Sequence, residues 1–118
     1  MTRLYLIKGH HPSLYWKTKI GITGDLKERR GGISRSMGVS IHYVTSRPLL
    51  FARAYEKALH WIFAPLRSPA WGNGGTEWFI CVRWLSFGLI WLLWLLETAA
   101  IMAAVVFLSI GIFATITN

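Results

Sequence analysis

The hydrophobic and polar positions divide this chain of 118 residues into two unequal parts. Residues 1–83 mix short apolar runs with polar stretches, whereas residues 84–117 are predominantly apolar and carry one charged residue, Glu97. As a single helix, residues 84–117 would be about 51 Å long at ~1.5 Å per residue, whereas the hydrocarbon core of a bilayer is only ~30 Å thick. The pattern therefore predicts a small soluble domain followed by a segment embedded in a membrane.

Three arrangements of the apolar segment fit its length. The first is a single tilted helix centred near Glu97, the second is a Trp-rich helix followed by a separate span, and the third is a re-entrant hairpin. An acid at the middle of a bilayer is costly unless it is paired or protonated, which favours moving Glu97 toward an interface. We therefore expect residues 84–97 to form a helix that caps the domain or lies in the interface, and residues 98–118 to form the transmembrane helix.

Three tryptophans mark the first of these two helices. Trp84, Trp91 and Trp94 are spaced so that they share one helical face. Amphipathic rings of this kind collect at the boundary between lipid and water. We therefore expect these tryptophans near the interface, with Arg83 at headgroup level.

In the soluble part, alternating patterns predict four β-strands. Residues 3–8 (RLYLIK) and 17–23 (KTKIGIT) alternate over short runs separated by a loop, which is typical of a hairpin. Residues 39–45 (VSIHYVT) and 76–82 (TEWFICV) predict the third and fourth strands.

Two helices are predicted between these strands. Asp25 and the two residues before it supply helix-start chemistry for LKERR, and we expect Gly31-Gly32 to end that short helix. Residues 48–63 have helical periodicity, with Pro48 in the first turn and Ser46 as a cap. The order β-β-α-β-α-β followed by an apolar helix indicates an α+β domain at residues 1–83.

The charges follow the same division as the hydropathy. All thirteen Lys and Arg residues and four of the five acidic residues lie within residues 1–83, which gives this part a net charge of +9. A surface this basic attracts the phosphates of nucleic acid or anionic lipid headgroups. Because every basic residue precedes the apolar segment, the positive-inside rule predicts a membrane protein whose N-terminal domain is cytoplasmic. Cys81 is the only cysteine, which excludes an intramolecular disulfide and fits a reducing compartment.

Several polar and charged residues occur along the domain in a definite order. They are Tyr5 in the first strand, Lys19-Ile20-Gly21 in the second, Arg29 eight positions after that glycine, Glu56 on the later helix, and Glu77-Trp78-Phe79. In order and spacing they resemble the GIY-YIG nuclease superfamily. They are most similar to its phage and bacterial branch, in which the second motif reads KIG, the helix reads A-R-x-x-E-K-x-L-H and the domain ends in EWF. The resemblance covers about residues 3–80.

This resemblance implies a small GIY-YIG-like domain that hydrolyses DNA phosphodiester bonds with one divalent metal such as Mg²⁺. It implies that Glu56 holds the metal, Arg29 stabilises the charge developing on the phosphate, and Tyr5 activates or orients the attacking water. Lys19 takes the place of the tyrosine of the second motif. These assignments agree with general chemistry, since Mg²⁺ is held through one or two carboxylates with waters and phosphate oxygens, and an Arg fork matches a phosphate.

The chain departs from the family pattern at two places. Ile33 stands where many members carry a histidine, four residues after the arginine, and His42 and His60 are the candidates to replace it. Asn73 lies near the place of an asparagine that often closes the site. Glu77 is expected at the rim of the site or behind the residues that contact substrate.

Two functions of different classes remain open. The first is a membrane-tethered endonuclease acting on DNA at the cytoplasmic face. The second is a catalytically degenerate module of the same fold that binds nucleic acid or an anionic membrane surface. A pore-forming protein would not need the whole motif set. Under both readings, basic residues beside the motifs are expected to contact phosphates: Lys17, Lys27, Arg30, Arg53 and Lys57.

Overall fold

The computed structural model describes residues 2–72 and 75–117 and confirms the α+β class. Four strands form one sheet, namely β1 (Arg3–Gly9), β2 (Lys17–Thr23), β3 (Ile41–Pro48) and β4 (Trp78–Ile80). The α-helices are α1 (Leu26–Met37), α2 (Ala52–Ile62) and α3 (Arg83–Thr117). Short 3₁₀ turns at Pro12–Leu14, Ala64–Leu66 and Gly75–Glu77 complete the described elements. The element order is the expected β-β-α-β-α-β followed by an apolar helix.

The sheet has the strand order β3-β1-β2-β4, and every neighbouring pair is antiparallel. β1 and β2 form the expected hairpin, in which Tyr5 is opposite Gly21 and Ile7 is opposite Lys19. β4 is short and pairs with β2 only over residues 17–19. The rest of this edge of β2, residues 20–23, therefore has no strand beside it in the described part of the chain.

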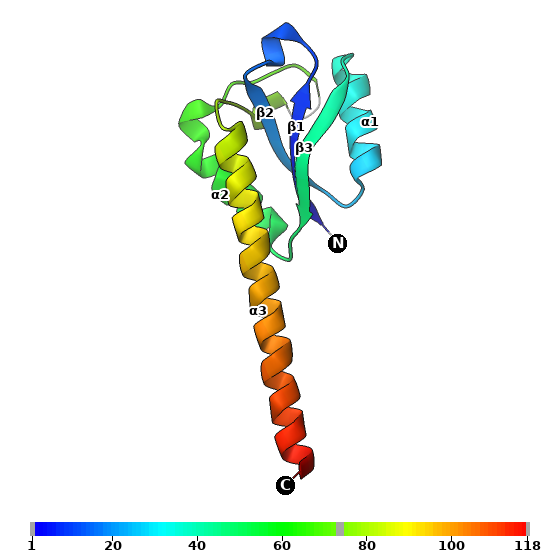
Figure 1. The fold of residues 1–118 in the computed structure, drawn as a ribbon. Helices are drawn as coiled ribbons and strands as arrows, with labels where there is room; N and C mark the ends of the chain where they lie inside the picture. The colour runs from blue at the N-terminus through cyan, green and yellow to red at the C-terminus, as the bar shows by residue number, and fades with distance from the viewer. Residues whose placement is uncertain (1, 73–74, 118) are drawn as a thin grey trace.

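Helices cover both faces of the sheet, α1 on one side and α2 with the first part of α3 on the other (Figure 1). Because successive side chains of a strand point to opposite faces, β1 supplies both cores. Tyr5 and Ile7 pack with Ile33 and Met37 of α1. The other face buries a larger cluster: Leu4, Leu6, Ile20, Leu49, Ala52, Leu59, Phe63, Phe79, Val82 and Ile90.

Two expected helix boundaries are wrong. α1 continues through Gly31-Gly32 to Met37, because Ile33 and Met37 are buried against the sheet and packing outweighs the low helix propensity of glycine. The helix ends instead at Gly38, which has the positive φ of 72° that favours glycine.

The start of α2 also differs from the expectation. Pro48 is the last residue of β3 rather than part of a helical turn, and Ser46 lies within β3 rather than at a cap. α2 begins at Ala52 with no cap from its own N-cap residue, Phe51.

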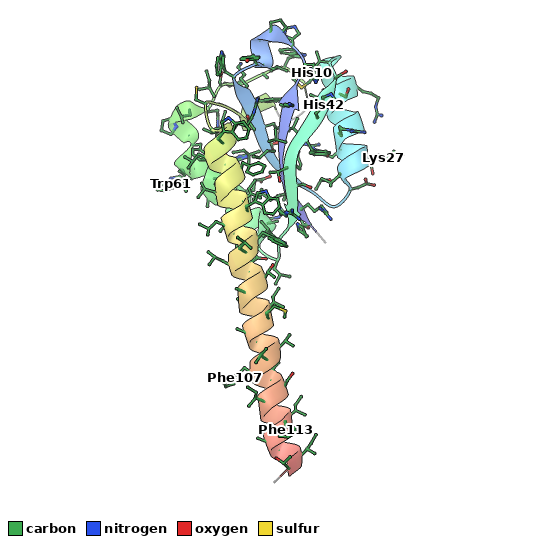
Figure 2. The ribbon with its side chains drawn as sticks, in the orientation of Figure 1. His10, Lys27, His42, Trp61, Phe107 and Phe113 are labelled. Carbon is green, nitrogen blue, oxygen red and sulfur yellow. The ribbon has the colours of Figure 1, made fainter. Side chains whose placement is uncertain are left out.

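α3 is one uninterrupted helix whose two halves have different surroundings. Ser86 and Ile90 are buried, and Phe87, Leu93 and Trp94 pack against the core, whereas every residue of 98–117 is exposed. The second half extends away from the domain, with Phe107 and Phe113 pointing outward (Figure 2). The molecule is therefore elongated, 66 Å along its longest axis. α3 is the one helix of the described chain that is long and apolar enough to cross a membrane.

The beginning of α3 lies beside the sheet, well away from this extension (Figure 1). The Arg83 side chain donates hydrogen bonds to Thr18 Oγ1 at 3.1 Å and to the Lys17 carbonyl at 3.0 Å. Arg83 lies 14 residues before Glu97, which is about 21 Å along the helix at ~1.5 Å per residue. A span confined to residues 98–117 would leave Arg83 that far from the headgroup level expected for it. A domain that ended at residue 83 would also lack Ile90, which is part of the buried core.

The three tryptophans of α3 do not share one environment. Trp91 and Trp94 lie against the domain, where the Arg47 guanidinium carbon is 3.7 Å and 4.8 Å from their ring centroids. Trp91 Nε1 also donates to Thr45 Oγ1 at 3.2 Å. Trp84 is 78% exposed at the start of the helix. Ring contacts through Phe87 join the three tryptophans in one row along α3. Their expected place at the interface stays a prediction.

Glu97 lies at the point where α3 leaves the domain. Its carboxylate accepts hydrogen bonds from the backbone N–H groups of Leu50 at 2.7 Å and Phe51 at 3.2 Å. These two donors lie just before α2. The N-cap residue of α2, Phe51, makes no side-chain hydrogen bond that caps the helix. The acid in the apolar segment therefore has structural partners on the domain.

Candidate functional site

The open edge of β2 is where residues from several elements meet. β4 stops at Trp78, opposite Lys19, so the edge beyond is left to α2. His60 Nε2 on α2 lies 2.8 Å from the Ile20 carbonyl, and because a carbonyl only accepts, this nitrogen carries the hydrogen. That bond brings α2 around the edge toward the face that carries Tyr5 and Lys19.

Tyr5 and Arg29 form the first pair of the site. Arg29 Nε donates to the Tyr5 hydroxyl at 3.1 Å, joining β1 to α1. Burial raises the pKa of Tyr5 to about 12, although the Arg29 charge opposes the rise. The Tyr5 phenol is therefore neutral at physiological pH. Its oxygen accepts from Arg29 and keeps its own proton.

Gly21 makes room for this pair. Tyr5 lies across the strand from Gly21, and a Cβ at that position would be 2.5 Å from the Tyr5 hydroxyl oxygen and 2.6 Å from Cζ. Cβ atoms essentially never make contacts this short, so the fully buried ring would have to shift. The glycine therefore sets where the phenol lies.

Lys19 and Glu77 form the second pair. The Lys19 side chain is fully buried, and its ammonium makes a salt bridge with Glu77, which directly precedes β4. Burial lowers the pKa of Lys19, while Glu77 opposes the shift. The weaker influences on Lys19 include the charges of Arg29 and Glu56.

Glu56 completes the group from α2. It is half-buried, and burial followed by repulsion from Glu77 raises the pKa of its carboxyl. His60, Lys19 and Arg53 oppose this rise through their charges. Within the described residues, no salt bridge involves the Glu56 carboxylate. The two carboxylates and the Lys19 ammonium therefore lie within electrostatic reach of one another.

Tyr43 is a neighbour of the site that the sequence did not indicate. Its ring contacts Tyr5 edge to face, with centroids 5.6 Å apart, and its hydroxyl donates to the Leu26 carbonyl. It lies in the third strand, where alternation alone marks it as an ordinary half-buried aromatic. Its register opposite Ile7 of β1, known only from the fold, brings it to Tyr5.

The expected auxiliary residues are separated by the fold. His60 and Glu77 join the group, as described above. His42 does not, since it is exposed at the other end of β3, with its ring 4.5 Å from that of His10 (Figure 2). Ile33 is fully buried in the core beneath α1. Asn73 lies outside the described residues.

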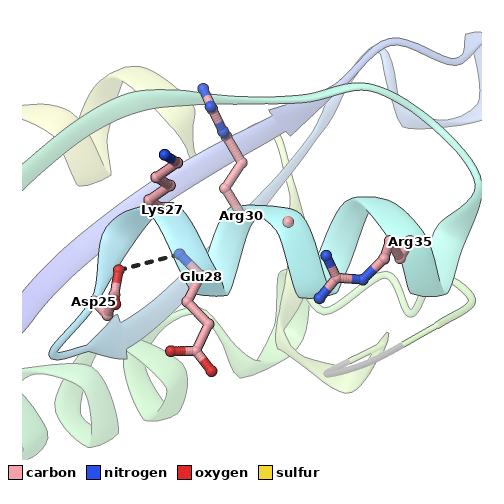
Figure 3. Close-up of a pocket in the computed structure, with 6 residues that line it drawn as sticks. Asp25, Lys27, Glu28, Arg30 and Arg35 are labelled. Carbon is pink, nitrogen blue, oxygen red and sulfur yellow. Dashed lines mark hydrogen bonds between the residues drawn. The ribbon is translucent and has the colours of Figure 1, made fainter.

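The basic residues expected to meet phosphate lie on both sides of the sheet. Lys27 and Arg30 are exposed on α1 and extend to one side of it, above a shallow hollow that Asp25, Glu28 and Arg35 also line (Figure 3). A neighbouring hollow reaches Arg29 of the site. Arg53 and Lys57 are exposed on α2. The Lys17 ammonium already has one hydrogen-bond partner, because it donates to the Pro69 carbonyl at 3.1 Å.

The donor set fits a hard cation of the Mg²⁺ type. In the described ranges, no three His, Cys, Asp or Glu side chains gather as a ready-made metal cage. Such a cage is not required, because Mg²⁺ is usually held by one or two carboxylates together with waters and phosphate oxygens. Glu56 is a half-buried carboxylate with a raised pKa and a second carboxylate nearby, so a cation beside it would relieve both effects.

Comparisons of this chain with protein-family models, with curated proteins and with solved structures gave no match.

Proposed function

We propose that this protein is a membrane-tethered, metal-dependent endonuclease that hydrolyses DNA phosphodiester bonds, with a GIY-YIG-like domain. The observation that carries the proposal is the convergence of Tyr5, Lys19, Arg29, Glu56 and Glu77 at the open edge of β2. These residues come from five separate segments of the chain. Their order along the sequence is the one that the resemblance to this nuclease family requires.

The charges and protons of the site assign different roles to its residues. Arg29 presents a permanent positive charge beside Tyr5, suited to a phosphate oxygen as negative charge develops on it. Tyr5, neutral because of its raised pKa, orients a water or a phosphate oxygen by donating its proton in a hydrogen bond. Lys19, held by Glu77, adds positive charge from the sheet.

Glu56 would hold the metal, with Glu77 close enough to support it. When bound, the divalent cation supplies a Lewis acid for the phosphate and lowers the pKa of a bound water. His60, bonded to the Ile20 carbonyl one turn further along α2, fixes the position of this part of the helix.

The membrane part of the proposal rests on α3. Residues 98–117 are exposed and apolar, and as a helix they rise about 30 Å, which matches the hydrocarbon core. The polar side chains near the end of this stretch bond to the helix itself: Ser109 to Val105 at 2.8 Å and Thr115 to Gly111 at 2.9 Å. The positive-inside rule places the basic domain on the cytoplasmic side.

A non-catalytic module that binds nucleic acid or anionic lipid is the second candidate. It is favoured by one observation, the salt bridge that already neutralises Glu77 with the Lys19 ammonium. Under this reading the site is a basic surface without a bound metal. DNA would then bind with an affinity that falls steeply with salt, and no divalent cation would produce cleavage.

The decisive experiment measures cleavage of plasmid DNA by the full chain in detergent micelles, with Mg²⁺ and with a chelator. We expect cleavage that needs the metal, is lost in Glu56→Gln, and falls about 10²–10³-fold in Arg29→Ala, the usual effect of removing one donor to a developing oxyanion. Arg29→Lys tests whether the guanidinium fork is needed beyond its charge.

Glu28→Gln is the matched control for Glu56→Gln. It is the same change at an exposed glutamate of α1, and we expect cleavage to persist and still to need the metal. Unchanged cleavage in both Glu56→Gln and Arg29→Ala would refute the assigned site. Salt-dependent DNA binding without cleavage at any divalent cation would establish the second candidate instead.

A further inference from the structure

The turn between β3 and α2 exposes two large apolar side chains. Leu50 is 58% exposed and Phe51 is 62% exposed, whereas the residues on either side of this pair, Leu49 and Ala52, are buried. Both side chains lie at the end of the domain from which α3 departs, since Leu50 and Phe51 bond to Glu97. Two adjacent exposed apolar residues at a turn are an unfavourable surface in water.

Glu97 holds this turn at a fixed place along α3. Its two carboxylate oxygens accept from two successive backbone N–H groups, so the turn is held at two points. Tyr55, one turn into α2, lies beside the same carboxylate; burial and its hydrogen bond to Glu97 raise the pKa of Tyr55. The turn therefore lies at the level of the residue that directly precedes the exposed stretch.

The length of the exposed stretch sets the level of the bilayer. Residues 98–117 span about 30 Å as a helix, so a hydrocarbon core that fits them begins immediately after Glu97. A helix that begins to cross at that point brings Leu50 and Phe51 to the boundary between lipid and water. Their apolar side chains would meet the acyl chains that already surround the neighbouring turn of α3.

Arginines accompany the exposed pair. Arg53, in the first turn of α2, is exposed. Arg3, in register with Pro48 of β3, is half-buried. Arg47 is also half-buried, and its guanidinium lies against Trp91 and Trp94. Glu97 is the one acidic residue of α3, and it already accepts hydrogen bonds from the turn. A surface of exposed apolar side chains with arginines beside it is suited to an anionic lipid leaflet.

We propose that the Leu50–Phe51 turn is a second membrane contact, which inserts into the headgroup region of the leaflet that α3 enters and prefers anionic lipid. The proposal rests on the proposed membrane span of residues 98–117. It adds that the domain lies on the bilayer surface in one orientation, with the turn and α3 as two contacts.

The test uses an environment-sensitive dye on single cysteines of the full chain in vesicles. Cys81 is exposed at the opposite end of the domain, next to β4 and the start of α3, and serves as the control site in the natural chain. The test protein carries Cys81→Ser and Phe51→Cys. The second change keeps the backbone N–H at position 51, which donates a hydrogen bond to Glu97. Each protein is reconstituted in phosphatidylcholine alone and in phosphatidylcholine mixed with phosphatidylglycerol.

We expect the dye at position 51 to show blue-shifted emission and strong quenching by lipids that carry a quencher near the headgroup. The effect should be larger with phosphatidylglycerol, and the dye on Cys81 should show neither change. Leu50→Cys, made in the same background, should repeat the result if position 51 disturbs the turn.

A separate measurement distinguishes this proposal from the span. Retention of the same samples in vesicles after an alkaline carbonate wash reports whether residues 98–117 are embedded. If the protein is retained in washed vesicles but dyes at positions 51 and 50 show the emission of a dye in water, the second contact is overturned and the span is left intact. Loss of the protein from washed vesicles would overturn both.

Discussion

Burial at the open edge of β2 shifts the pKa values of three titratable side chains. It raises the pKa of Tyr5 to about 12, raises that of Glu56 and lowers that of Lys19. In Glu56 and Lys19 the shift disfavours the charge that each would carry at neutral pH. Shifts of this direction within one cluster are typical of functional sites, although buried structural ion pairs also produce them. Lys19 and Glu77 form such an ion pair, whereas Glu56 makes no salt bridge within the described residues.

The raised pKa of Glu56 predicts a stability cost. A carboxyl whose pKa is higher in the folded than in the unfolded state favours folding most when protonated, and that contribution is lost as the pH rises through the raised pKa. Without metal, Glu56→Gln should therefore raise the Tm at neutral pH, by no more than a few degrees because Glu56 is only half-buried. The difference from the natural chain should disappear below the pKa of an unfolded glutamate.

Thermal unfolding of both proteins from acid to neutral pH, in the same detergent, measures this effect. Added Mg²⁺ should raise the Tm of the natural chain and leave that of Glu56→Gln unchanged. An equal or lower Tm for the variant at neutral pH, without metal, would show that Glu56 has a stabilising partner.

Among the elements, α2 depends on α3 for its N-terminal cap. The first N–H groups of a helix lack partners within it, and here Glu97 supplies acceptors to the two residues that precede α2. Because α2 carries Glu56 and His60, its first turn positions part of the site.

Glu97→Ala should destabilise the domain by about 0.5–2 kcal/mol, the usual effect of losing a cap. For a domain of this size, that corresponds to a Tm lower by roughly 4–8 °C per kcal/mol. Glu97→Gln, which keeps one carbonyl oxygen as an acceptor, should lose less. Thermal unfolding measured by circular dichroism provides the comparison, and an unchanged Tm in Glu97→Ala would show that water replaces the carboxylate at no cost.

The elements that the sequence predicts well are those whose pattern is local. The alternation in residues 3–8 and 17–23 is sufficient for the β1–β2 hairpin, because one face of each strand must be buried. The extension of α1 through Gly31-Gly32 is not predictable in this way, since it depends on Ile33 and Met37 meeting the sheet. Pro48 likewise suits a strand end or a helical turn, and only its pairing with Arg3 decides.

The candidate site was predictable as a set of residues but not as a geometry. The motif order identifies Tyr5, Arg29 and Glu56, and the fold brings them to one edge. The salt bridge between Lys19 and Glu77 depends on where β4 stops, and no local pattern shows it. The partners of Glu97 were hidden for the same reason, because they lie 46 and 47 residues away in the chain.

For the whole molecule, the charge distribution predicts one orientation across a membrane. The basic domain should be cytoplasmic and the C-terminal end of α3 should reach the other side. In bacterial cells that express the protein, Cys81 should therefore resist a membrane-impermeant maleimide applied from outside and react after lysis, since it is exposed on the domain.

A cysteine placed at Thr117, in a Cys81→Ser background, is the control with the opposite expectation. It should react in intact cells if α3 crosses the membrane completely. Labelling of Cys81 from outside would reverse the orientation, and labelling of neither position before lysis would favour a helix that enters the bilayer without crossing it.

The absence of a break in α3 limits the reach of the site. A domain on a flexible linker samples a volume above the membrane, whereas a domain fixed to a continuous helix rotates about one axis and diffuses in one plane. Thr18, next to Lys19 of the site, is bonded to Arg83, about 21 Å along the helix from Glu97 at ~1.5 Å per residue. With α3 upright in a membrane, nucleic acid would meet the site only at about that height above the lipid. For the proposed nuclease, the length of a helix would then set the height above the membrane at which the site meets nucleic acid.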